Sequence, residues 1–267
     1  MKTFIRSNPL PSFFLMTFAF TWIVWFSIYA LHLSSTAGYL PFLLGAAGPS
    51  LMAFAVSAII GGKQEVKNLW QRIAVWRVSL LWYLIALFFP AIIVLVAIGI
   101  YRLTGATVPA FTLLAKEWYL LPIALISGLL LGGPLEEEFG WRGFAIVHLQ
   151  KHQSALASSL IVGIIWGIWH LPAFLITWST QHNLPVLLFL LHDIALSVLI
   201  TWIFNNTGGS VLLTMLAHGA FNLTITILPL LPSAAGSERP LVIAVILLYI
   251  AALLVILVFG ARTFTRD

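Results

Sequence analysis

Three consecutive glutamates, Glu136, Glu137 and Glu138, end a long apolar run in a chain that has only eight acidic residues. A carboxylate at the middle of a bilayer costs about 3 kcal/mol even on a lenient insertion scale, so ionisable groups at membrane depth are candidates for function. The alternative is a run of charges that ends a membrane helix among the lipid headgroups. Composition alone does not separate the two interpretations.

Arg142 separates the roles of the three carboxylates. On a helix, Glu138 and Arg142 lie four residues apart on one face, with the acid in the favoured N-terminal position. Glu137 is rotated by about 100° from Glu138, so it is predicted to point into the helix bundle, free to act as a base. Glu136 is rotated by about another 100° and is expected to face the headgroups.

Three of the seven histidines, His170, His192 and His218, lie within apolar runs. His170 follows Trp166 by one helical turn and precedes Pro172, which cannot donate a backbone hydrogen bond and favours a kink. The sequence therefore predicts an inward-facing His170. His192 is followed by Asp193, which could support another histidine or simply be satisfied by a neighbour; we favour the second interpretation.

The third histidine, His218, shares a helical face with Asn222 at i+4. The ring and the carboxamide can direct hydrogen-bond donors at a common point. A structural hydrogen bond between two membrane helices would use the same pair, and for this pair alone it is the favoured interpretation.

Several catalytic mechanisms are excluded by the residue types. The chain has no cysteine, no His-Glu-x-x-His sequence and no Gly-x-Ser-x-Gly sequence, which excludes thiol nucleophiles, the usual zincin helix and the serine-hydrolase elbow. Asp193 is the only aspartate within an apolar run, and Asp267 is the last residue. A mechanism with two buried aspartates is therefore excluded as well.

The elements that must position these residues are membrane helices. Of the 267 residues, 61% are hydrophobic and 8% are charged, against roughly 25% charged residues in a soluble domain. We predict an all-α, polytopic membrane protein with the site inside the bundle. The first apolar run is longer than a signal-peptide core and lacks a cleavage sequence, so it is expected to be a retained helix. The eight expected spans lie at about 10–31, 39–60, 79–101, 119–138, 155–177, 184–204, 210–231 and 241–260.

The spans are predicted to form three regions. Residues 1–118 form an N-terminal region of three membrane helices, residues 119–231 a catalytic core, and residues 232–267 a last membrane helix with a short cytoplasmic tail. Near 63–76, apolar residues recur at helical spacing beside lysines and an arginine. This pattern predicts a helix that lies on the cytoplasmic leaflet.

Basic residues predict the orientation. Ten of the 13 fall on one side of the predicted topology, so the positive-inside rule places both termini in the cytoplasm. The basic residues form no stripe, so we expect no nucleic acid partner. The ten are Lys2, Arg6, Lys63, Lys67, Arg72, Arg77, Arg142, Lys151, Arg262 and Arg266, against Arg102, Lys116 and Arg239 on the other side.

Three motifs follow one another on separate predicted helices: Glu137-Glu138-Phe-Gly-Trp-Arg142, Trp166-Gly-Ile-Trp-His170 and His218-Gly-Ala-Phe-Asn222. Together they resemble the CPBP family of intramembrane proteases, also called the CAAX amino-terminal protease or Abi family. The resemblance extends over about 120–228 and includes Asn205-Asn-Thr-Gly-Gly-Ser210. Trp166 stands where phenylalanine is commoner in the family, a change that keeps an aromatic residue.

The family resemblance implies an intramembrane endopeptidase. Glu137 and His170 would hold and activate a water molecule, with Glu137 as the general base, while His218 and Asn222 would stabilise the oxyanion. The residues implied as catalytic are Glu137, Glu138, His170, His218 and Asn222, with Arg142 and Trp166 in support.

A metal stays an open alternative at this stage. Two histidines and a glutamate are a familiar catalytic zinc set, so a divalent metal such as zinc would be held by Glu137, His170 and His218. The position of Asn222 beside His218 suits an oxyanion site better than zinc ligation, and this favours a mechanism without a tightly held metal.

The implied partners are the lipid bilayer and a membrane-associated protein or peptide, either of CAAX type or a bacteriocin or leader peptide. The protein is expected in the plasma (inner) membrane. Two other functions are compatible with the same motifs: a non-catalytic bacteriocin self-immunity protein, and a proton-coupled transporter. The transporter would be expected to contain an inverted repeat, and the sequence shows none.

Overall fold

The computed structural model describes residues 2–109, 111 and 116–266. Within these residues every regular element is helical, which confirms the predicted all-α class. Eight segments are long and apolar enough to cross a membrane, as predicted. They are Pro9–Ala30, Ser35–Ala74, Leu80–Leu103, Trp118–Leu149, Ala155–Leu175, Val186–Asn206, Val211–Ala235 and Arg239–Phe259.

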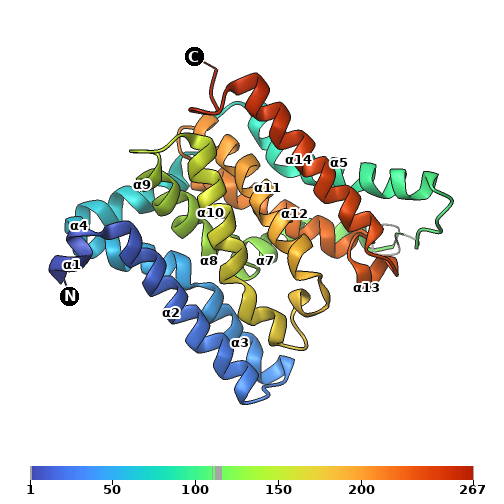
Figure 1. The fold of residues 1–267 in the computed structure, drawn as a ribbon, viewed down its shortest axis with the longest axis horizontal. Helices are drawn as coiled ribbons and strands as arrows, with labels where there is room; N and C mark the ends of the chain where they lie inside the picture. The colour runs from blue at the N-terminus through green and yellow to red at the C-terminus, as the bar shows by residue number, and fades with distance from the viewer. Residues whose placement is uncertain (1, 110, 112–115, 267) are drawn as a thin grey trace.

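Figure 1 shows the helices in chain order, and residue 103 ends the first group of them. This group contains α1 (Lys2–Ser7), α2 (Pro9–Ala30), α3 (Ser35–Ala46), α4 (Gly48–Gln71), η1 (Arg72–Ala74) and α5 (Leu80–Leu103). After it lie η2 (Trp118–Leu120), α7 (Leu121–Leu131), α8 (Pro134–Glu138), the π-helical η3 (Phe139–Ile146), α9 (Val147–Leu149), α10 (Ala155–Trp169), η4 (Leu171–Leu175), η5 (Thr180–Asn183), α11 (Val186–Asn206), α12 (Val211–Ile227), α13 (Pro232–Ala235) and α14 (Arg239–Phe259).

Helices α2, α3 and α4 pack together at one end of the molecule (Figure 1). Two hydrogen bonds connect α2 and α3: the Thr21 hydroxyl donates to the Gly45 carbonyl at 2.7 Å, and the Trp25 indole donates to the Phe42 carbonyl at 3.0 Å. Helix α4 also contacts α8, because the Ser50 hydroxyl donates to the Leu135 carbonyl at 2.8 Å. The N-terminal helices therefore brace the segment that carries the three glutamates.

Helices α5, α10, α11, α12 and α14 form the rest of the bundle. Helices α10 and α11 approach most closely at Gly163, where an added Cβ would stand 2.7 Å from the Cα of Ile194. Nearby, the Ser197 hydroxyl donates to the Ser159 carbonyl at 2.8 Å. Close contacts through small residues, with hydroxyls bonded across the interface, are typical of helices packed in a membrane.

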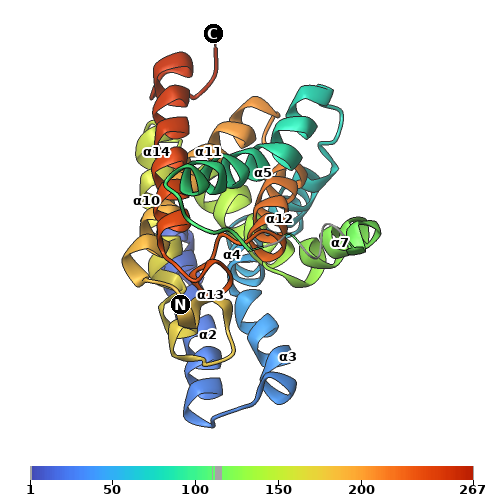
Figure 2. The same ribbon diagram turned by 90° about the vertical axis from the view of Figure 1, so that its right-hand side faces the viewer.

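The fourth span is broken near its middle. Helix α7 projects from one side of the bundle (Figure 2) and has no buried residue. The chain then turns at Gly132 and at Gly133, which has φ +109°, and α8 begins at Pro134. The helix continues through the π-helical η3 to Leu149, so the prediction that this span ends at 138 is wrong.

The predicted interfacial segment is helical and begins after a kink. Gly62 has φ +64° inside α4, and the helix resumes from Lys63 to Gln71. Its apolar side packs partly on protein: Leu69 is buried, and the Trp70 ring stacks on Phe139 with centroids 5.6 Å apart. Contact of this helix with a membrane surface stays a prediction.

Candidate active site

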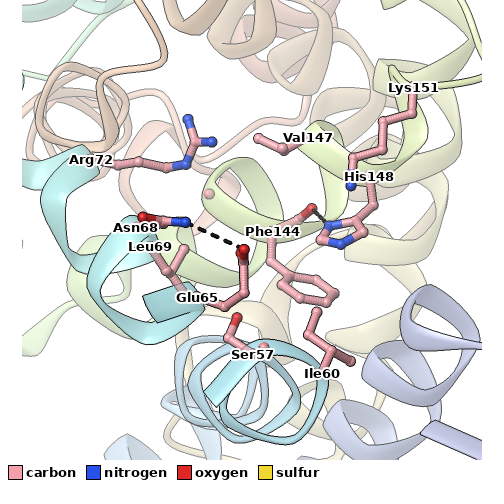
Figure 3. Close-up of a pocket in the computed structure, with 12 residues that line it drawn as sticks. Ser57, Ile60, Glu65, Asn68, Leu69, Arg72, Phe144, Val147, His148 and Lys151 are labelled. Atoms are coloured by element: carbon pink, nitrogen blue, oxygen red, sulfur yellow. Dashed lines mark hydrogen bonds between the residues drawn. The ribbon is translucent and has the colours of Figure 1, made fainter. Parts of the chain in front are cut away.

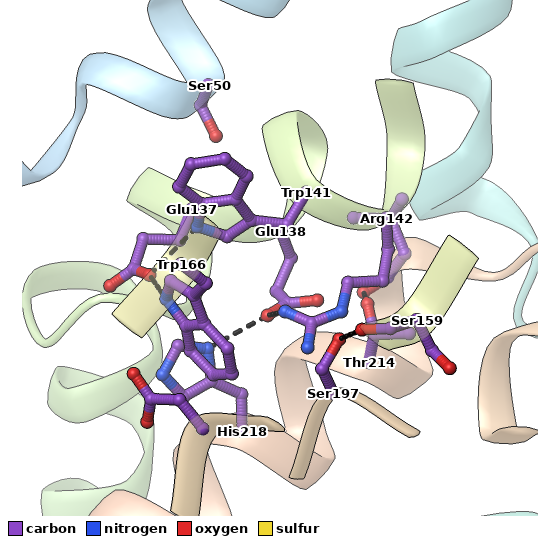
Figure 4. A network of polar contacts seen from close by, with 12 residues as sticks. Ser50, Glu137, Glu138, Trp141, Arg142, Ser159, Trp166, Ser197, Thr214 and His218 are labelled. Atoms are coloured by element: carbon purple, nitrogen blue, oxygen red, sulfur yellow. Dashed lines mark hydrogen bonds and ion pairs between the residues drawn. The ribbon is translucent and has the colours of Figure 1, made fainter. Parts of the chain in front are cut away.

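The Glu137 side chain lies on α8 and is 4% exposed. One carboxylate oxygen, Oε2, accepts hydrogen bonds from two indole N–H groups (Figure 4): that of Trp166 at 2.6 Å and that of Trp141 at 3.2 Å. Two donors on one oxygen fix the carboxylate in a single orientation. The other oxygen, Oε1, is left to face the break in the fourth span.

Gly133 lies directly beside the free oxygen of Glu137. A Cβ added at Gly133 would stand 2.8 Å from Glu137 Oε1, and 3.7 Å from both Asn222 Nδ2 and His218 Cε1. These three side chains therefore converge on one point. A residue with a side chain would fill that point, and the φ of +109° at Gly133 favours glycine on backbone grounds as well.

Glu138 is paired as the sequence predicts. Its Oε1 accepts a hydrogen bond from Arg142 Nη1 at 2.7 Å, and both side chains are fully buried. The same oxygen accepts from His218 Nδ1 at 2.9 Å. The Arg142 guanidinium also lies over the Trp166 ring, 4.6 Å from its centroid. Arg142 therefore holds the site together, and it cannot serve as a loop charge that marks the cytoplasmic side.

Glu136 does not face the headgroups, and that prediction is wrong. The residue is 8% exposed, and its Oε2 accepts a hydrogen bond from the Gly133 backbone N–H at 3.1 Å. It occupies the third position of α8, where an acid can satisfy a backbone donor at the helix start. The prediction failed because one continuous helix was assumed through this span, although Gly132-Gly133-Pro134 is typical of a helix break with proline at the start of a new helix.

His170 stands where α10 ends and the 3₁₀ turn η4 begins. Its Nδ1 lies 3.0 Å from the Trp166 carbonyl oxygen and 3.5 Å from Asp193 Oδ2. Because both neighbours are acceptors, Nδ1 carries a hydrogen, and Nε2 of the neutral ring is free to accept.

Asp193 also contacts the neighbouring histidine. Its Oδ1 lies 3.0 Å from His192 Nδ1, so the carboxylate stands between His192 and His170. The contact with His192 agrees with the favoured interpretation, in which the pair is satisfied by a neighbour. The 3.5 Å approach to His170 also fits the alternative, in which Asp193 supports a histidine of the site, and that role stays a prediction.

His218 and Asn222 both bond to other segments. His218 Nδ1 donates to Glu138, and Asn222 Nδ2 donates to the Gly132 carbonyl at 3.0 Å. The structural role favoured for this pair is thus present. These two bonds leave Nε2 of the ring and the second N–H of the amide unused.

Trp141 is the main residue that motif reading missed. It lies four residues after Glu137, as Arg142 lies four residues after Glu138, so the same i+4 rule could have paired it with Glu137. The role of the Trp166 indole was missed as well, because the aromatic ring and not its N–H was considered.

The predicted metal ligands do not fit a metal centre as they lie. Within the part of the chain that the structure describes, no three His, Cys, Asp or Glu side chains are arranged to hold a metal ion. The Nδ1 atoms of His170 and His218 are turned toward oxygen acceptors, which leaves Nε2 as the nitrogen of each ring that could bind a metal. We therefore derive the chemistry from the side chains alone.

Comparison with known proteins agrees with this geometry. Residues 118–224 match the family model described as type II CAAX prenyl endopeptidase Rce1-like. This stretch is similar to an Rce1-like domain. It contains all three motifs, so the resemblance to this family of intramembrane proteases is confirmed. The chain is also 28% identical to CAAX prenyl protease 2 of Methanococcus maripaludis over 260 residues, which cover 91% of this chain and 94% of that protein.

The Rce1-like domain carries most of the described site but depends on other segments. Ser50 on α4 holds the start of α8, and Pro49 packs so closely on η3 that a Cβ at Gly140 would lie 2.6 Å from the Pro49 carbonyl oxygen. The N-terminal helices are therefore part of the framework around the domain.

Proposed function

We propose that this intramembrane endopeptidase is glutamate-dependent, with Glu137 as the general base. The observation that supports it best is that the two oxygens of the Glu137 carboxylate have different surroundings. Oε2 is held by two indole N–H groups, while Oε1 faces the point where His218 and Asn222 also converge. A base held in one orientation, with donors opposite it, is what peptide hydrolysis requires.

In the proposed reaction, water bound between Glu137 and His170 attacks the carbonyl carbon of the substrate. Glu137 Oε1 takes one proton from the water, and His170 Nε2 accepts a hydrogen bond from the other O–H. When the tetrahedral intermediate collapses, the C–N bond breaks and Glu137 returns its proton to the leaving amine. The products are a carboxylic acid and an amine, and the enzyme is regenerated.

The oxyanion of the intermediate would accept hydrogen bonds from Asn222 and His218. Asn222 has a second N–H besides the one bonded to Gly132. His218 donates Nδ1–H to Glu138. Donation from Nε2 as well requires the positively charged imidazolium form, and the negative charge of the Glu138 carboxylate beside the ring favours that form. An oxyanion donor of this kind contributes about 3 kcal/mol to lowering the barrier.

For the substrate, we propose a membrane-anchored polypeptide with a prenylated CAAX-type C-terminus. The support is the name of the similar archaeal protein, CAAX prenyl protease 2, together with a site buried among helices that are apolar enough to meet a lipid anchor. We further propose that both termini are cytoplasmic. Nine basic residues still support this orientation after the buried Arg142 is removed from the ten.

The test is a mass spectrum of the products that purified protein makes from a library of prenylated and unprenylated peptides. The variant E137Q keeps the size and the hydrogen-bond acceptor of Glu137 but cannot act as a base. Exposed Glu238 provides the matched control E238Q. We expect cleavage of prenylated peptides by the native protein and E238Q, and none by E137Q. Undiminished cleavage by folded E137Q would refute the mechanism. No cleavage by the native protein would favour a non-catalytic role such as immunity, whereas removal of a leader segment would refute only the proposed substrate.

A further inference from the structure

A second polar cavity, of about 300 Å³, lies between α4 and the C-terminal part of the fourth span (Figure 3). Its walls come from the α4 segment around the Gly62 kink and from η3 and α9. None of the residues assigned to the candidate active site lines it. Its polar wall residues are Ser57, Glu65, Asn68, Arg72, His148 and Lys151.

The cavity has more positive than negative charge. Arg72 and Lys151 are permanent cations, and among the described residues neither has a carboxylate within 4.0 Å. The one acidic wall residue, Glu65, accepts a hydrogen bond from Asn68 Nδ2 at 3.3 Å. The Arg72 side chain is partly buried, with its guanidinium 5.8 Å from the Phe204 ring centroid. A partly buried guanidinium without a paired carboxylate is stabilised by a bound anion, because burial of an unpaired charge is unfavourable.

The far wall is held in place by its own contacts. His148 Nδ1 donates to the Phe144 carbonyl oxygen at 2.8 Å, and the imidazole stacks on the Phe144 ring with centroids 4.1 Å apart. Lys151 lies in the turn that follows α9 and is exposed. The cavity therefore has a fixed wall and a cation that is reached from outside.

Residues around the cavity are those of a membrane–water boundary. Trp70 and Trp76 are each 57% exposed, and Lys63 and Lys67 are exposed on the same helix as the cavity wall. Exposed tryptophans next to lysines at the end of membrane spans are typical of the headgroup level. An anion that reaches the cavity there can come from a lipid.

We propose that this cavity binds the phosphate of an anionic phospholipid headgroup, with Arg72 and Lys151 as its ligands. The planar guanidinium of Arg72 matches two phosphate oxygens, and Lys151 supplies a point charge beside them. The volume is at the lower end of the range of small-ligand pockets. This assignment does not depend on the proposed function of the active site.

The experiment measures lipid binding to the full chain in detergent by native mass spectrometry and by thermal unfolding, with phosphatidylglycerol and phosphatidylcholine as probes. The variant R72Q/K151Q removes both cavity cations, and K63Q/K67Q is the matched control that removes two neighbouring charges outside the cavity. A cation near anionic lipid contributes about five-fold to binding. We therefore expect R72Q/K151Q to bind phosphatidylglycerol about 25-fold more weakly, K63Q/K67Q to change it less than two-fold, and neither to alter phosphatidylcholine binding.

Equal losses in the two double variants would overturn the proposal, because they would indicate attraction by diffuse surface charge. Retention of native affinity in R72Q/K151Q would overturn it as well. The single variant K151Q changes an exposed position and can be used if R72Q/K151Q does not fold. Its affinity for phosphatidylglycerol should fall about five-fold. An unchanged affinity would overturn the proposal. Soluble glycerol 1-phosphate is the third probe: saturation of the site by it alone, with the same sensitivity to K151Q, would overturn the assignment to lipid.

Discussion

Replacement of Trp166 by phenylalanine tests the arrangement around Glu137 most directly. The change W166F removes the indole N–H that donates to Glu137 Oε2 at 2.6 Å and keeps an aromatic ring beneath the Arg142 guanidinium. The shorter of the two indole hydrogen bonds is lost, and the carboxylate keeps only the one from Trp141 at 3.2 Å.

The expected magnitude follows from the kind of bond removed. A hydrogen bond to a charged group contributes about 1.5–3 kcal/mol, and the short distance at Trp166 is typical of a charge-assisted bond. If about 2 kcal/mol of the preference for the productive carboxylate orientation is lost, kcat falls about 30-fold. KM should change little, because the indole touches the base and not the substrate.

The assay is the steady-state hydrolysis of a fluorogenic prenylated peptide in detergent or nanodiscs, with thermal unfolding measured on the same samples. W141F is the comparison, since it removes the longer of the two bonds to the same oxygen; we expect a smaller fall in kcat. In the E137Q background, W166F should have no further effect on turnover. A kcat of W166F within two-fold of the native value, in protein that unfolds at the native temperature, would refute the idea that the indoles orient the base.

Three further predictions concern the neighbours of Glu137. G133A should lower kcat at least 100-fold, because the added Cβ would stand 2.8 Å from Glu137 Oε1 at a backbone φ that residues with side chains rarely adopt. The control is G128A, where the added Cβ meets nothing within 4 Å. This variant should have the native kcat in the same assay. R142M should lower the free energy of unfolding by about 3–5 kcal/mol in a denaturant titration, because it removes the cation paired with the buried Glu138 carboxylate. A decrease under 1 kcal/mol would contradict this. D193N should lower kcat about ten-fold through the position of His170, with unchanged unfolding; native turnover would show that Asp193 has no such role.

Residue patterning along the chain was enough to predict the membrane fold. The eight spans follow from apolar runs alone, since each helix has to satisfy its backbone groups internally within lipid. The Glu138–Arg142 pair was predictable for a related reason: the i+4 rule needs only one helix.

The features that were missed depend on contacts between helices or on local backbone geometry. The Trp166 indole donates across 29 positions of sequence to Glu137, and Asp193 meets His170 across 23 positions; neither contact belongs to a periodic pattern. The turn at Gly133 is indicated by Gly132-Gly133-Pro134, but the burial of Glu136 depends on packing of α8 on α4 and α12. A single sequence contains no direct sign of these approaches.

The bond between Glu138 and His218 joins positions 80 residues apart, and this separation has a consequence for biogenesis. The fourth span leaves the ribosome while four later spans, among them the one that carries His218, have yet to be made. During that interval the Glu138 carboxylate has Arg142 alone, and the oxyanion donors proposed for catalysis do not yet exist. A nascent chain of this protein would therefore have no proteolytic activity until its seventh span is inserted, so unfinished copies could not cut other proteins at their site of synthesis.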